Sequence, residues 1–146
     1  TNRVIALERA GRTDDAVVAI KALLVADPSN AKGYYRIAEI LSDAGRSEEA
    51  LDWLDKLPVK DADTALAIYN ATVHLFNAGK MRAVADAMRK AVAAAPDAAY
   101  AHKLLGQALL NLGELPEAAK ELEEFLRLAP GDPDAESTRK ILKAIE

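Results

Sequence analysis

Apolar residues recur along the chain at steps of three and four, which is the period of an α-helix. Residues 99–130 show the pattern most clearly, with two apolar stripes that are separated by a polar turn. The first stripe consists of His102, Leu105, Gly106 and Leu109. The second consists of Ala118, Leu122 and Phe125. No run of alternating polarity is long enough for a strand, so the pattern predicts an all-α fold built from pairs of helices.

The helical pattern repeats with a period of 34 residues. Its clearest marker is a glycine, found at Gly11, Gly45, Gly79 and Gly113. A leucine lies four residues before each glycine, and a small or β-branched apolar residue lies five residues after it. Glycine tolerates a positive φ angle and therefore ends one helix before the next begins. Because these columns stay in phase, we predict four stacked units, each a pair of helices.

The second helix of each pair has start and stop signals of its own. Thr13 and Ser47 are predicted N-caps, because each hydroxyl precedes two acidic residues. Pro116 suits the first turn of a helix, and Pro130 ends that helix. Lys80 offers no capping side chain. We therefore expect the helix that follows it to fray.

Two prolines predict where the pattern changes. Pro58 lies inside an expected helix, where it removes a hydrogen bond and clashes with the preceding turn. We expect that helix to end near Leu57 and residues 58–61 to form a loop. The sequence Asp132-Pro133-Asp134 predicts a last helix, with Asp132 as N-cap and Pro133 in the first position. Its polar outer face would cap the end of the stack.

The pattern resembles the tetratricopeptide repeat, a 34-residue helix–turn–helix with a bulky residue at position 4, Leu-Gly-like residues at positions 7 and 8, Ala at 20 and Pro at 32. Position 1 falls at Ala31, Ala65 and Ala99, which puts Leu105-Gly106 at positions 7 and 8. The resemblance covers the whole chain and implies an α-solenoid, a right-handed superhelix of antiparallel helix pairs. The implied single array comprises a partial repeat 1–30, repeats 31–64, 65–98 and 99–131, and a capping helix 132–146.

In this family the first helices of the repeats line a concave groove, so the resemblance implies a set of groove residues at positions 2, 5, 9, 12 and 13. In the second unit these are Lys32, Tyr35, Glu39, Ser42 and Asp43. In the third they are Leu66, Tyr69, Val73, Phe76 and Asn77. In the fourth they are Tyr100, Lys103, Gln107, Leu110 and Asn111.

The third unit's apolar strip, residues 66–76, has two interpretations. It can bind the apolar face of an extended or helical peptide, with Asn77, Gln107 and Asn111 bonding to the peptide backbone. Alternatively, neighbouring helices cover the strip as ordinary core. We expect Tyr35, Tyr69 and Phe76 to be exposed to solvent.

Some relatives hold the C-terminal carboxylate of heat-shock chaperones with a clamp of Lys, Asn and Arg side chains. Asn2, Lys32 and Arg36 match the last three clamp positions and are weak candidates for that role. Glu39 and Asp43 argue against it, because two acids in the groove would repel a carboxylate.

Composition and charge narrow the classes of partner. The 146 residues are 51% hydrophobic and 29% charged, which is typical of a globular protein. The net charge of −4 argues against nucleic acid or an anionic membrane surface as the main partner. No apolar run approaches the roughly 20 residues of a membrane span. We expect a soluble protein, either cytoplasmic or periplasmic.

The chain offers little catalytic chemistry. Without cysteine it has no disulfide, thiol nucleophile or Cys-bound metal. His74 and His102 lie in columns that pack between helices, so we expect both to be packing residues without a third metal ligand. No glycine cluster forms a phosphate loop, and no serine lies in a nucleophile elbow. We therefore predict no enzyme, metal or cofactor site.

The sequence predicts a protein-interaction scaffold that binds a protein or peptide. Because the chain opens with Thr1, we expect it to be part of a larger protein. One alternative is a docking or spacer segment of a multidomain enzyme. Another is self-association, giving a homodimer through the N-terminal face, where the apolar residues Val4, Ile5 and Leu7 lack an outer neighbour.

Overall fold

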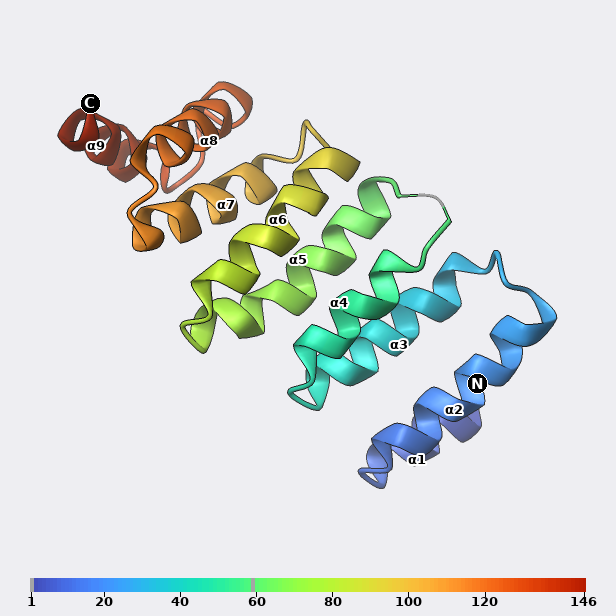
Figure 1. The fold of residues 1–146 in the computed structure, drawn as a ribbon. Coiled ribbons are helices and arrows are strands. Elements are labelled where there is room, and N and C mark those ends of the chain that lie inside the picture. The colour runs from blue at the N-terminus through green and yellow to red at the C-terminus, as the bar shows by residue number, and fades with distance from the viewer. Residues whose placement is uncertain (1, 59) are drawn as a thin grey trace. The chain divides into compact units, whose positions relative to one another are not determined.

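The computed structural model describes residues 2–58 and 60–146. These residues form nine α-helices and no strand, which confirms the all-α prediction for the described part of the chain (Figure 1). The helices are α1 (Asn2–Arg9), α2 (Thr13–Ala26), α3 (Ala31–Asp43), α4 (Ser47–Asp55), α5 (Ala62–Asn77), α6 (Met81–Ala94), α7 (Ala99–Leu112), α8 (Leu115–Leu128) and α9 (Ala135–Ile145).

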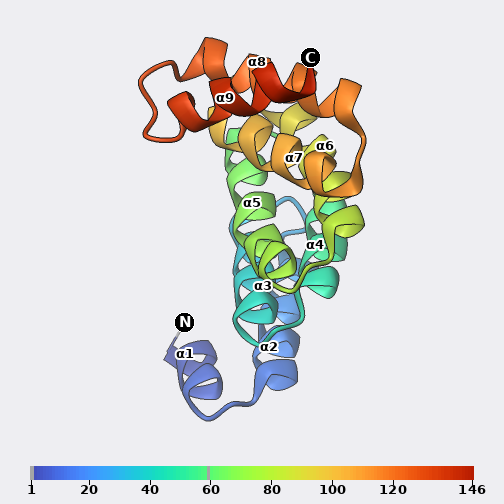
Figure 2. The same cartoon turned by 90° about the vertical axis from the view of Figure 1, so that its left-hand side faces the viewer.

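The chain divides into two compact units, residues 1–74 and 75–146. The first unit holds α1 to α4 and most of α5, and the second holds the last turn of α5 and α6 to α9. Consecutive helices pack within each unit: α1 on α2, α2 on α3 and α3 on α4, then α6 on α7, α7 on α8 and α8 on α9. Figure 2 shows α9 lying along α8 in the second unit.

The four repeat glycines end helices in the left-handed conformation, as predicted. Their φ angles are 71° at Gly11, 78° at Gly45, 77° at Gly79 and 75° at Gly113. In each turn the amide after the glycine donates to the carbonyl of the leucine four residues before the glycine, at 2.8 to 3.0 Å. This bond pattern is the Schellman motif. It explains why both columns recur every 34 residues, because the glycine provides the φ angle and the leucine the acceptor.

The predicted N-caps of α2 and α4 are wrong. Thr13 and Ser47 are the first helical residues, and Arg12 and Arg46 occupy the cap positions without a side-chain cap hydrogen bond. Each arginine instead donates from Nε to the acid three residues later, at 2.7 Å. Lys80, at the cap of α6, also makes no side-chain cap bond, so the start of α6 does not differ from these two.

The loop around Pro58 interrupts the second repeat, residues 31–64, as predicted. Helix α4 ends at Asp55, two residues before the expected end at Leu57. Pro58 and Lys60 both lie outside helices. Val59, which belongs to the predicted loop, lies outside the described residues.

Helix α5 begins earlier than the repeat pattern indicates. It starts at Ala62, three residues before position 1 of the third repeat at Ala65. A capping box explains the extra turn, because Asp61 and Thr64 bond to each other reciprocally. The Thr64 amide donates to Asp61 Oδ1 and the Asp61 amide donates to Thr64 Oγ1, both at 3.1 Å.

The last helix begins later than predicted, at Ala135. Asp132 accepts a hydrogen bond from the Asp134 amide at 2.8 Å, so it stabilises a turn that precedes the helix and does not cap it. Pro133 belongs to this turn. Helix α9 buries Ala135 and other side chains of one face, and it packs on α8.

Candidate functional site

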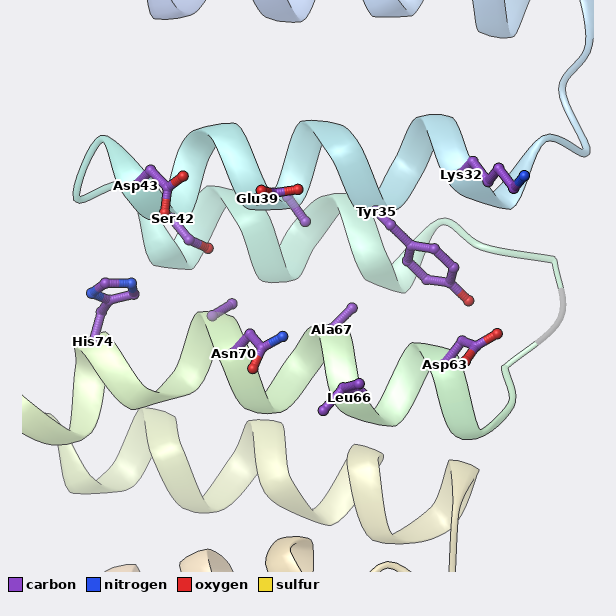
Figure 3. Close-up of a pocket in the computed structure, with 12 residues that line it drawn as sticks. Lys32, Tyr35, Glu39, Ser42, Asp43, Asp63, Leu66, Ala67, Asn70 and His74 are labelled. Carbon is purple, nitrogen blue, oxygen red and sulfur yellow. The ribbon is translucent and has the colours of Figure 1, made fainter. Parts of the chain in front are cut away.

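A groove of about 610 Å³ lies between α3 and α5 in the first unit (Figure 3). Its α3 wall consists of Lys32, Tyr35, Ala38, Glu39, Ser42 and Asp43. Its α5 wall consists of Asp63, Leu66, Ala67, Asn70, Ala71 and His74. The buried alanines form an apolar floor, and the longer polar side chains stand along the rim.

The α3 wall contains all five residues that the family register placed in the groove from the second repeat, residues 31–64. Of the five residues predicted from the third repeat, only Leu66 lines this groove, and it is 47% exposed. Tyr69, Val73 and Phe76 are half-buried and Asn77 is exposed, away from the groove lining. Tyr35 is also half-buried, so the three aromatic residues expected to be exposed are neither fully exposed nor buried.

Sequence reasoning missed the α5 residues Asp63, Ala67, Asn70 and His74 because the first helix of a repeat can line a groove with either of two sides. The predicted positions describe the side that α3 turns towards this groove, whereas α5 lines it with the opposite side. A signal was available, since Asn70 and His74 follow Leu66 at steps of four and therefore share its face. The prediction of a packing role for His74 is wrong, because His74 is exposed and lines the groove.

Tyr35 is fixed in the groove through its hydroxyl. The hydroxyl oxygen lies 3.0 Å from Thr64 Oγ1 and 3.4 Å from Asp61 Oδ1, at the capped start of α5. Burial raises the pKa of Tyr35, and the nearby Asp61 adds to that increase. The Thr64 amide lowers the pKa of Asp61. This network holds α3 to the beginning of α5. Because the Tyr35 hydroxyl is engaged in it, a ligand in the groove would contact the Tyr35 ring.

The groove residues predicted on α7 lie in the second unit. Tyr100, Gln107 and Leu110 are half-buried there. Asn111 is exposed, and its amide group donates to the Gln107 carbonyl of its own helix at 3.1 Å.

Lys103, also on α7, forms ion pairs with the turn that precedes α9. Its Nζ lies 3.1 Å from Asp134 and 3.6 Å from Asp132, and 5.2 Å from the Phe125 ring centroid. Burial lowers the pKa of Lys103, but the two carboxylates outweigh it and leave the pKa raised. Lys103 thus holds the turn before α9 in place.

Comparison with known proteins identifies the family. Two family models, both described as tetratricopeptide repeat, match residues 7–71 and 70–133. The chain is a tetratricopeptide repeat protein. No curated protein matches its sequence.

Solved tetratricopeptide repeat structures share the fold. The crystal structure of MamA is 27% identical with a TM-score of 0.65, over 96% of this chain and 85% of that one. The first such domain of Spaghetti (RPAP3), bound to the HSP90 peptide SRMEEVD, is 25% identical with a TM-score of 0.58, over 77% of this chain and 92% of that one. YrrB, described as having an unusual peptide-binding site, is 21% identical with a TM-score of 0.64, over 98% and 74%. YrrB therefore shows similarity of fold alone.

The three clamp candidates of this tetratricopeptide repeat protein lie in different surroundings. Arg36 donates to Glu8 and pairs with Glu39 at 3.2 Å, so two carboxylates of its own chain already engage its guanidinium. Asn2 is exposed on α1, and Lys32 is exposed at one end of the groove.

The second histidine has the packing role that was predicted. His102 is 5% exposed, with Nδ1 2.6 Å from Glu121 Oε2 and Nε2 2.6 Å from the Pro96 carbonyl oxygen. Within residues 2–58 and 60–146, no three histidines or acids are grouped so that they could hold a metal ion. Among these same residues, no helix has the length and apolar character needed to span a membrane.

Proposed function

We propose that this tetratricopeptide repeat chain is a protein-interaction module that binds a peptide or partner helix in the α3–α5 groove. The observation that carries the proposal is the groove itself. Its volume of about 610 Å³ falls within the range of roughly 300 to 1,000 Å³ that is typical of binding pockets. Leu66 offers exposed apolar area, and the Asn70 carboxamide can bond to a peptide backbone.

The similar domain of RPAP3 supports the proposal, because that domain is bound to a short peptide. The Arg36 guanidinium is already paired with Glu8 and Glu39. We therefore favour a ligand that binds through an internal stretch of peptide over one that binds through its terminal carboxylate.

Filling the groove should abolish peptide binding. Short random peptides are displayed and selected on the wild-type chain, and their affinities are then measured by fluorescence polarisation. Ala67 lies half-buried in the α5 wall, so Ala67→Trp places a large ring where the peptide would lie. We expect a loss of affinity of at least about tenfold.

The matched control for this experiment is Ala93→Trp, at an exposed alanine of α6 outside the groove. It should leave the affinities unchanged, and circular dichroism should show both variants folded. Equal binding by wild type and Ala67→Trp would show that the selected peptides bind elsewhere and would overturn the proposal.

Self-association is a second candidate function, and one observation favours it. Among the residues that the structure describes, seven large hydrophobic ones are exposed, and four of these, Ile5, Val18, Leu23 and Val25, lie on α1 and α2. At the Val18 position the later repeats carry Asp52, Asp86 and Lys120. Repeat stacking therefore does not require an apolar residue there. The partner we propose is a second copy of this chain, because a two-fold contact requires only that one apolar strip complement itself.

Light scattering tests this candidate through the mass of the protein in solution. The mass should rise above the 15.6 kDa of one chain as concentration increases. Val18→Asp should raise the dissociation constant by at least about tenfold, because it places a charge in the apolar contact. Ile141→Asp, at an exposed residue of α9, is the control and should change nothing. A mass of one chain at every concentration would exclude self-association.

A further inference from the structure

The α3–α5 groove is electrostatically uneven along its length. Lys32 and Asp63 stand at one end, and Asp43 and His74 stand at the other (Figure 3). Glu39, between the two ends, pairs with an arginine of its own helix at 3.2 Å. Asp43 forms no ion pair with any residue that the structure describes. The Asp43 end thus carries a carboxylate without an ion-pair partner among the described residues, whereas the opposite end holds a cation, Lys32, as well as Asp63.

The position of Asp43 is unfavourable for α3 on its own. Glu39 and Asp43 are four residues apart, so two carboxylates share one face of the helix and repel each other. Asp43 is also the last residue of α3, where the helix dipole is negative and favours a cation. A positively charged group bound at this end would relieve both effects.

Ser42 gives an independent indication of a missing partner. It lines the groove next to Asp43 and is only 6% exposed. Its Oγ is buried and makes no hydrogen bond within the described residues, and Figure 3 shows this side chain directed towards α5. A buried hydroxyl without a partner is costly, and such atoms are rare in folded proteins. This end of the groove therefore has an unused hydrogen-bonding position as well as an unpaired charge.

We propose that the Asp43 end of the groove binds a basic side chain of the peptide, with a guanidinium as the preferred group. This inference rests on the proposed peptide-binding function and specifies its ligand. A guanidinium has one charge and five N–H donors in a plane, so it can donate to the Asp43 carboxylate and the Ser42 hydroxyl together. A lysine ammonium supplies the charge without that planar set of donors.

The test uses peptides from the display selection whose binding is lost in Ala67→Trp. Arginine should be enriched among them, and its replacement by citrulline, a neutral isostere, should weaken binding by about tenfold. Asp43→Asn should weaken the arginine peptide by a similar factor and change the citrulline peptide less than about twofold, because the two changes remove the same interaction. Asp52→Asn, at an exposed residue of α4 outside the groove lining, is the matched control and should have no effect.

Ser42→Ala separates a role in binding from a role in folding. The hydroxyl has no hydrogen-bond partner among the described residues of the free chain, so alanine should maintain or raise the melting temperature. It should nevertheless weaken the arginine peptide by about threefold, through loss of one hydrogen bond.

Failure of this inference and failure of the proposed function give different results. Groove-dependent peptides that lack basic residues, or that bind equally well with arginine and citrulline, would overturn the basic-site inference alone. Peptides that bind Ala67→Trp as well as wild type would overturn the groove proposal, and the inference with it.

Discussion

Replacement of His102 by leucine should lower the free energy of unfolding by about 3 kcal/mol. The ring lies between two hydrogen-bond acceptors, the Glu121 carboxylate and the Pro96 carbonyl, each at 2.6 Å. The side chains of His102 and Glu121 are only 6% and 14% exposed. Leucine would leave a nearly buried carboxylate and a carbonyl without partners, and an unpaired buried charge is among the costliest defects.

Urea unfolding measures this loss, and two optical signals locate it. Circular dichroism reports helices in both units, whereas the chain's one tryptophan, Trp53, lies in the first unit. The loss should be clear by circular dichroism and smaller by tryptophan fluorescence. The double variant His102→Leu with Glu121→Leu should recover much of the stability, because an apolar pair replaces the polar one. An unchanged unfolding midpoint for His102→Leu alone would show that the pair is not stabilising.

The helices and turns could be predicted because local requirements of the backbone fix them. A positive φ angle at Gly45 and its three counterparts demands glycine at the same point of each repeat, and Pro58 cannot continue a helix. The N-caps were predicted less well. Arg12 and Arg46 occupy the cap positions, and a guanidinium has no acceptor for the first amides of a helix. Helical periodicity does not fix a helix boundary to a single residue, so it could not show that Thr13 and Ser47 lie one position too late to cap.

Contacts between helices could not be predicted from spacing alone. Glu121 lies 19 residues from His102, so their pairing depends on how α7 and α8 align. In the groove, spacing puts Asn70 on the face of Leu66, but only the packing of α5 beside α3 turns that face, and not the face of Tyr69, towards the groove. The predicted residues therefore included the α3 wall and missed most of the α5 wall.

Replacement of Gly106 by valine should lower the free energy of unfolding by about 2 to 3 kcal/mol. A Cβ atom at Gly106 would lie 2.6 Å from Leu122 Cδ2 and 2.8 Å from Leu122 Cγ, well inside van der Waals contact. Leu122 is 2% exposed, so its side chain can shift only by displacing packed neighbours. Valine is the better helix former by a few tenths of a kcal/mol, which is too little to offset the overlap.

The control for Gly106→Val is Gly131→Val. A Cβ at Gly131 would meet no atom within 4 Å, and its φ angle is not positive, so that variant should unfold near the wild-type midpoint. The double variant Gly106→Ala with Leu122→Ala should lose less free energy of unfolding than the two single variants lose in sum, because the second change removes the atoms that the first would strike. Strict additivity, or a stable Gly106→Val, would mean that α7 can move away from α8 at little cost. Position 8 of the fourth repeat would then be small for a reason other than close packing of these two helices.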